Sequence, residues 1–210
     1  NGYLRLCGRV DMRAVERTVQ TLLANGFNPQ SGDDPYNLLV YTSFQERATR
    51  VSHANVAGRA AAAGDGGLAR ICRLIAGDEA RHETFYTRMM GRVLDLDPAG
   101  GILAFATMLD QHITMPGRLM AGADDPELFE HFATVAQSIG VYTGHDYAAI
   151  VDHLVAAWDV AGRSVSGEAA RAQDRLCGSA IRYARLAERV SAKIRRRTPV
   201  PFSWIRNRKA

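Results

Sequence analysis

The stretch "QERATRVSHANVAGRAAAAGDGGLARICRLIAGDEARH", residues 45–82, predicts a helical hairpin and so decides the fold class. Its centre, "GDGG" at residues 64–67, is a turn signal because glycine tolerates backbone conformations that other residues avoid. Pro35 suits the first position of a helix that runs to about Ala63, and a second long helix is expected from Leu68 to about Leu94. Together they predict an antiparallel hairpin with arms as long as those of a helical bundle.

Helical signals recur along the rest of the chain. Asp11 can cap a helix over residues 12–25, and Gly26 can close it. Further helices are expected over residues 99–112, 126–139, 146–160 and 166–196. The prolines near the end stop helical structure and leave a tail that is compatible with a short paired strand. No alternating pattern is long enough to build a sheet, so the sequence predicts an all-α fold.

Composition sets the broad class. The chain has 210 residues, 47% hydrophobic and 23% charged, which suits a single domain over residues 1–210 with a buried core. The net charge of +4 comes without a basic stripe interleaved with aromatic residues, so no nucleic-acid partner is expected. The Arg195–Arg197 run suits an acidic protein partner or a solvated tail. No apolar run approaches the roughly 20 residues of a membrane-spanning helix, so no membrane association is expected.

Glu46, Glu79 and His82 are the candidate metal ligands. Glu79 and His82, at i and i+3, project from the same side of a helix. Such a Glu-x-x-His pattern occurs by chance in many helices. However, the turn between the two helices brings Glu46 to a height similar to that of Glu79. One Glu facing a Glu-x-x-His motif is half of the ligand set of four-helix di-iron proteins.

The helix that carries Glu46 has a stripe that is mostly apolar or small and polar. Stepping by three or four residues gives Leu38 or Leu39, Thr42, Glu46, Thr49 and His53. A buried, unpaired carboxylate is costly, so a metal or another cation has to compensate if this stripe faces inward. Thr49 is either a packing residue or a hydroxyl beside the metal. His53 is expected to be a core residue or to lie behind the ligands.

Two charged residues flank the ligands on the second helix. Asp78 is a candidate to orient the ligand imidazole and Arg81 to pair with a carboxylate, although both are also compatible with an exposed position. Glu83 is expected to point away from Glu79 and to lie at the surface.

At this point the chain resembles a known family, the soluble acyl-acyl-carrier-protein (acyl-ACP) desaturases of the stearoyl-ACP type. The matching strings occur in family order along the chain. They are "CGRVDMR" (7–13), "YTSFQERAT" (41–49), "DEARHET" (78–84), "MLDQHITMP" (108–116), "FEHFATVAQSIGVYT" (129–143) and "PFSWI" (201–205).

The resemblance implies a ferritin-like helical bundle that holds two irons, takes electrons from ferredoxin and introduces a cis double bond into an acyl chain on acyl carrier protein. It implies that Glu46 is a terminal carboxylate, Glu79 a bridging carboxylate, His82 a terminal imidazole and Thr49 the hydroxyl near the oxygen site. It also implies a narrow acyl tunnel and, commonly, a homodimer. Residues expected along that tunnel are Leu38, Leu39, Thr42 and Met115, and bulky leucines there would favour a chain shorter than stearoyl.

The family site uses four carboxylates and two histidines, and half of them are not found here. The remaining Glu and Glu-x-x-His would precede residue 1, and the first 34 residues contain a single Glu, Glu16, and no His. We therefore expect an N-terminally truncated sequence, the C-terminal two-thirds of a desaturase with its first helices missing, that is inactive alone. The alternatives are a non-catalytic scaffold that binds carrier protein, and another ferritin-like protein such as an iron store or a radical-generating oxidase.

Residue usage also bears on the compartment. Three cysteines without a C-x-x-C spacing support neither a disulfide framework nor a zinc site and indicate a reducing compartment. The strong preference for Arg over Lys and the many alanines indicate a GC-rich bacterial genome and hence a bacterial cytoplasm. The alternative is the plastid stroma, where plant members of the family work.

Overall fold

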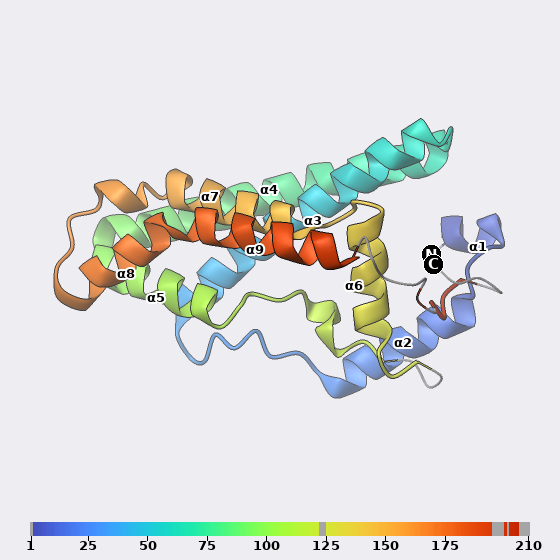
Figure 1. The fold of residues 1–210 in the computed structure, drawn as a ribbon, viewed down its shortest axis with the longest axis horizontal. Coiled ribbons are helices and arrows are strands. Elements are labelled where there is room, and N and C mark those ends of the chain that lie inside the picture. Colours follow the sequence, from blue (N-terminus) through green and yellow to red (C-terminus); the bar gives the residue numbers. More distant parts are fainter. Residues whose placement is uncertain (1, 122–124, 195–199, 201, 206–210) are drawn as a thin grey trace.

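The structure is a computed structural model that describes residues 2–121, 125–194, 200 and 202–205 (Figure 1). Its helices, in chain order, are α1 (Gly2–Cys7), α2 (Met12–Asn25), α3 (Pro35–Ala62), α4 (Gly66–Leu96), α5 (Pro98–Asp110), η1 (Pro116–Leu119), α6 (Leu128–Ser138), α7 (Gly144–Ala157), η2 (Val160–Gly162), α8 (Gly167–Cys177) and α9 (Ser179–Ile194). No strand forms within the described ranges, so the all-α prediction is confirmed.

The hairpin of α3 and α4 is the longest feature of the molecule and forms its rear layer in Figure 1. α3 starts where the Asp34 side chain accepts the backbone N–H of Tyr36, and α4 starts where the Asp65 side chain accepts that of Leu68. Gly64 has a φ of 79°, the left-handed conformation that the turn between the helices requires. These local signals explain why both arms lie close to their predicted bounds.

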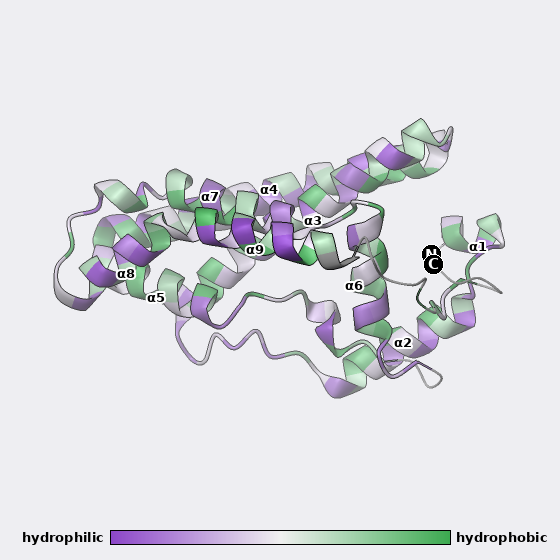
Figure 2. Ribbon diagram, viewed as in Figure 1, coloured by the Kyte–Doolittle hydropathy of each residue, from purple (hydrophilic) through white to green (hydrophobic). Residues whose placement is uncertain are grey.

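One side of the hairpin is covered by α5, α7, α8 and α9, and the core lies between these layers. The largest fully buried side chains include Trp158, Phe44 and Phe105. Trp158 packs edge-on against Phe105 and donates its indole N–H to the Thr87 carbonyl of α4 at 3.0 Å. Figure 2 shows polar and apolar residues alternating around α9, as expected for a helix with one face on this core.

Residues 202–205, near the end of the chain, contact both α2 and α6. Val10 and Ile205 form an antiparallel bridge, and the Trp204 indole donates to the hydroxyl of Thr18 at 3.1 Å. The Phe132 ring of α6 lies 5.7 Å from that of Trp204, centroid to centroid. The tail predicted to pair as a strand therefore pairs at one bridge within the described residues.

The prediction of one continuous helix over residues 166–196 is wrong. Two helices, α8 and α9, form instead, and α8 packs on α5 while α9 packs on α7. Ser179, fully buried, marks the break and donates its hydroxyl to the Leu176 carbonyl at 2.5 Å. The basic run at residues 195–197 lies outside the described residues. Among the helices that are described, none is both long and apolar enough to cross a bilayer.

Candidate metal centre

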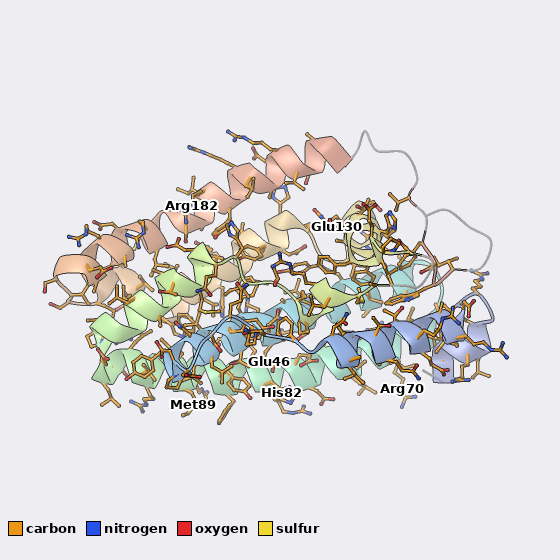
Figure 3. All side chains as sticks on the ribbon, turned by 90° about the horizontal axis from the view of Figure 1, so that it is seen from below. Glu46, Arg70, His82, Met89, Glu130 and Arg182 are labelled. Carbon is orange, nitrogen blue, oxygen red and sulfur yellow. The ribbon has the colours of Figure 1, made fainter. Side chains whose placement is uncertain are left out.

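Three side chains converge between α3 and α4. Glu46 comes from α3, and Glu79 and His82 come from α4; one ligand atom from each lies within 4.8 Å of the other two. His82 Nδ1 is 3.3 Å from a Glu46 oxygen and 3.2 Å from a Glu79 oxygen. Figure 3 shows Glu46 and His82 next to each other across the two helices. The hairpin register that the sequence predicted therefore brings the three candidate ligands together.

The charges of the site favour a cation. Desolvation, the main cause, and the adjoining Glu79 carboxyl raise the pKa of Glu46, while the nearby His82 opposes the rise. A carboxyl group with a pKa raised in this way is stabilised as an anion when a metal ion binds beside it. Carboxylate oxygens and an imidazole nitrogen are donors that iron and other first-row metals accept. The residues present thus fit a metal ion on chemical grounds.

Ligand exposure differs within the site. The Glu46 and Glu79 side chains are each 20% exposed, whereas His82 is 58% exposed. His82, Met89 and Arg70 lie along the lower edge of Figure 3, on the side of the hairpin away from α9. The candidate metal centre is thus open on the side that no described helix covers.

The Thr49 hydroxyl lies one turn after Glu46. It donates within its own helix, to the carbonyls of Gln45 at 3.1 Å and Glu46 at 3.0 Å. His53 follows one turn later and is half-buried. Their predicted roles, the oxygen-site hydroxyl and a histidine behind the ligands, stay predictions.

The predicted tunnel residues occupy different environments. Leu38 is 47% exposed, and the Thr42 hydroxyl donates to its carbonyl. Leu39 and Met115 are half-buried and pack against the core. Contact of these residues with an acyl chain stays a prediction.

A comparison with known proteins decides the family. A model of the fatty acid desaturase family matches residues 1–206. The chain belongs to this family. The ferritin-like helical bundle that the resemblance implied follows from that membership together with the all-α structure.

Curated relatives of this desaturase chain are named stearoyl-ACP 9-desaturases. One from Solanum commersonii is 48% identical over 206 residues, which cover 98% of this chain and 52% of the relative. One from Helianthus annuus is 49% identical over 207 residues, with the same coverage. A third, from Oryza sativa subsp. indica, is 47% identical over 209 residues, covering 99% of this chain and 53% of the relative. The chain spans about half the length of the relatives it matches.

The expected bacterial cytoplasm is contradicted by these names, because the relatives of this desaturase chain are described as chloroplastic. The compartment in these names is the plastid, which was the alternative. Arg and Ala usage reflects the base composition of a genome, which does not determine where a protein resides.

The flanking residues Asp78 and Arg81 form an ion pair with each other. Their side chains are 56% and 74% exposed, so the exposed alternative is the one that the desaturase structure shows. The predicted roles of Asp78 and Arg81 beside the ligands stay predictions.

The surface position expected for Glu83 is wrong. Its residue is 5% exposed, and its carboxylate pairs with Arg47 and Arg50 of α3. Four residues span one helical turn plus about 40°, so Glu83 lies on the same side of α4 as Glu79 and faces α3. That spacing was available in the sequence and is the signal that sequence reasoning missed.

Proposed function

We propose that this chain is part of an acyl-ACP desaturase that introduces a cis double bond into a fatty acyl chain on acyl carrier protein. The observation that carries the proposal is the convergence of Glu46, Glu79 and His82 in a chain of the fatty acid desaturase family. The names of the relatives support stearoyl-ACP as the substrate class.

The metal in the proposal is iron. Removal of hydrogen from an unactivated acyl chain lies beyond acid–base chemistry, and iron supplies the required oxidising power when it is bound. Glu46 and Glu79 would hold it with negatively charged oxygens and His82 with a neutral nitrogen. Thr49, one turn from Glu46, would offer its hydroxyl beside the site.

A di-iron site needs more ligands than the three that converge here. The ferritin-like arrangement takes a Glu from each of two helices and a Glu-x-x-His motif from each of two others. The proposal therefore requires a second Glu and a second Glu-x-x-His motif from outside these 210 residues. On this basis the 210-residue chain alone would be inactive. Ferredoxin as electron donor and a homodimer are further parts of the proposal.

The test uses the product of the complete gene that encodes this chain. With reduced ferredoxin, dioxygen and stearoyl-ACP, we expect a monounsaturated product by gas chromatography–mass spectrometry and two irons per chain. Glu79→Ala should abolish the product and lower the iron content, whereas exposed Glu188→Ala on α9 should change neither. A folded, iron-loaded protein that forms no monoene would contradict the proposal and favour the scaffold.

A further inference from the structure

We propose that Glu83 is a positioning residue for the metal centre. It binds Arg47 and Arg50 and so fixes α3 against α4 at the level of the ligands. This inference rests on the proposed metal-binding function, and it assigns a role to a group that does not itself bind the metal.

The contacts of Glu83 use both of its oxygens. Arg47 Nη1 donates to Oε1, and Arg50 Nη1 donates to Oε2 at 2.8 Å. His153 of α7 also lies near, with its Nε2 3.6 Å from Oε1. The Glu83 side chain is 6% exposed, so this carboxylate is held from two sides within the packed layer between α3, α4 and α7.

The ion pairs of Glu83 lie beside the metal ligands in both helices, and this placement lets them position the ligands. Arg47 directly follows Glu46 in α3, and Glu83 directly follows His82 in α4. Successive residues of a helix point about 100° apart, so the same turns carry the ligand contact in one direction and the ion pair in another. Two links in different directions fix both the rotation and the axial register of one helix against the other, whereas one link leaves a pivot.

On the side of the hairpin where the metal ligands lie, few contacts of the described residues hold the ligands in position. His82 is 58% exposed, and no described helix packs over it. Among the described residues, positional restraint therefore comes from the covered side, where Glu83 lies. A metal site loses affinity when its ligands are not held close to the bound geometry.

Stability alone is a weak reason for these charges. Burying a carboxylate with its guanidinium partners requires their desolvation, and well-packed apolar residues often stabilise a protein equally well or better. A carboxylate bound by two guanidinium groups has one favourable geometry, so it fixes the relative position of two helices more closely than apolar side chains do.

Arg47→Gln tests the proposal by the direction in which the affinity for a metal ion changes. Loss of a positive charge beside a cation site should, on charge alone, strengthen metal binding. Loss of positioning should weaken it. We expect Co²⁺ titration of the complete gene product to show an increase of about tenfold in the dissociation constant, with a changed visible absorption spectrum, at unchanged helix content. Unchanged or tighter Co²⁺ binding would overturn the proposal.

Glu83→Gln is the second variant, and weaker Co²⁺ binding with an altered spectrum is again expected. The matched control is Asp95→Asn, which removes another ion pair of α4, to Arg163, about 24 Å along the helix from Glu79. It should leave Co²⁺ binding at the wild-type value. Equal Co²⁺ affinity in wild type and Glu83→Gln would refute this inference alone, whereas a wild-type product of the complete gene that binds no Co²⁺ would count against the proposed function.

Discussion

Neighbouring residues of the hairpin point in different directions from the same helical turns. His82 is largely exposed at the candidate metal centre, while its neighbour Glu83 is buried against α3. The sequence sufficed to predict the first set, since Glu79 and His82 follow helical spacing and the turn sets the height of Glu46. For Glu83, the spacing from Glu79 already indicates a side chain that faces α3, but its full burial also depends on α7, which brings His153 from a distant part of the chain.

His153 should make stability depend on pH. Burial, first, and then Arg47 lower the pKa of His153 below its ordinary value of 6.5, and Glu83 only partly opposes this. Below pH 6.5 the unfolded chain therefore binds a proton that the folded chain does not, and stability falls as the pH falls. In urea unfolding at pH 7.5 and 5.5, His153→Gln should lose less stability on acidification than the wild type. His145→Gln, at an exposed position of the same helix, should behave as the wild type.

Leu38 offers a test of chain-length preference. It is 47% exposed and was predicted to line the acyl tunnel. If it limits the tunnel, Leu38→Gly in the complete gene product should shift the preference from 16- towards 18-carbon acyl-ACP by up to about 15-fold, since two methylenes are worth about 1.6 kcal/mol. Leu186→Gly, at a leucine 50% exposed in α9, is the control. The same ratio of products before and after the Leu38 change would refute the tunnel assignment.

At the scale of elements, helices with strong local signals were predictable. α3 starts at its proline and α4 is preceded by the glycine turn, so the bounds of both follow from the sequence to within two residues. The break between α8 and α9 lacks such a signal. It arises because each helix packs on a different partner, α5 or α7, and packing of that kind cannot be read from one helix alone.

Close packing of α5 on α4 gives a prediction at this scale. A Cβ added at Gly101 would lie 2.5 Å from Cδ2 and 2.9 Å from Cγ of Leu94, which is 1% exposed and has no room to move. Gly101→Ala should therefore destabilise the fold by about 1–3 kcal/mol through overpacking. The free energy of unfolding in urea measures the effect.

Gly58→Ala is the matched control for Gly101. Gly58 is exposed in α3, and an added Cβ would meet no atom within 4 Å. Alanine has the higher helix propensity, so this change should stabilise the fold by about 0.5–1 kcal/mol. If both glycine variants stabilised the fold, helix propensity rather than the approach of α5 to α4 would govern Gly101.

On the scale of the whole molecule, the hairpin separates the packed core from the open metal centre. α5, α7, α8 and α9 lie on one side, and the candidate ligands face the other (Figure 3). Exposed apolar residues, among them Leu74, Phe85 and Met89, accompany them on α4. The sequence predicted the family and the bundle through its motifs, but which side of each helix the chain covers became clear only from the packing.

Metal binding should therefore stabilise the whole chain. An ion that binds only the folded state at 100 times its dissociation constant adds about 2.7 kcal/mol, since the unfolded chain separates Glu46 from Glu79 and His82. For a chain of 210 residues this corresponds to a rise of about 5–11 °C in Tm. Calorimetry with and without Co²⁺ measures it. Glu79→Gln should lose most of the rise and exposed Glu188→Gln should keep it. A rise of the same size in both variants would mean that the ion binds elsewhere, and Glu46, Glu79 and His82 would then be a charged cluster without a metal.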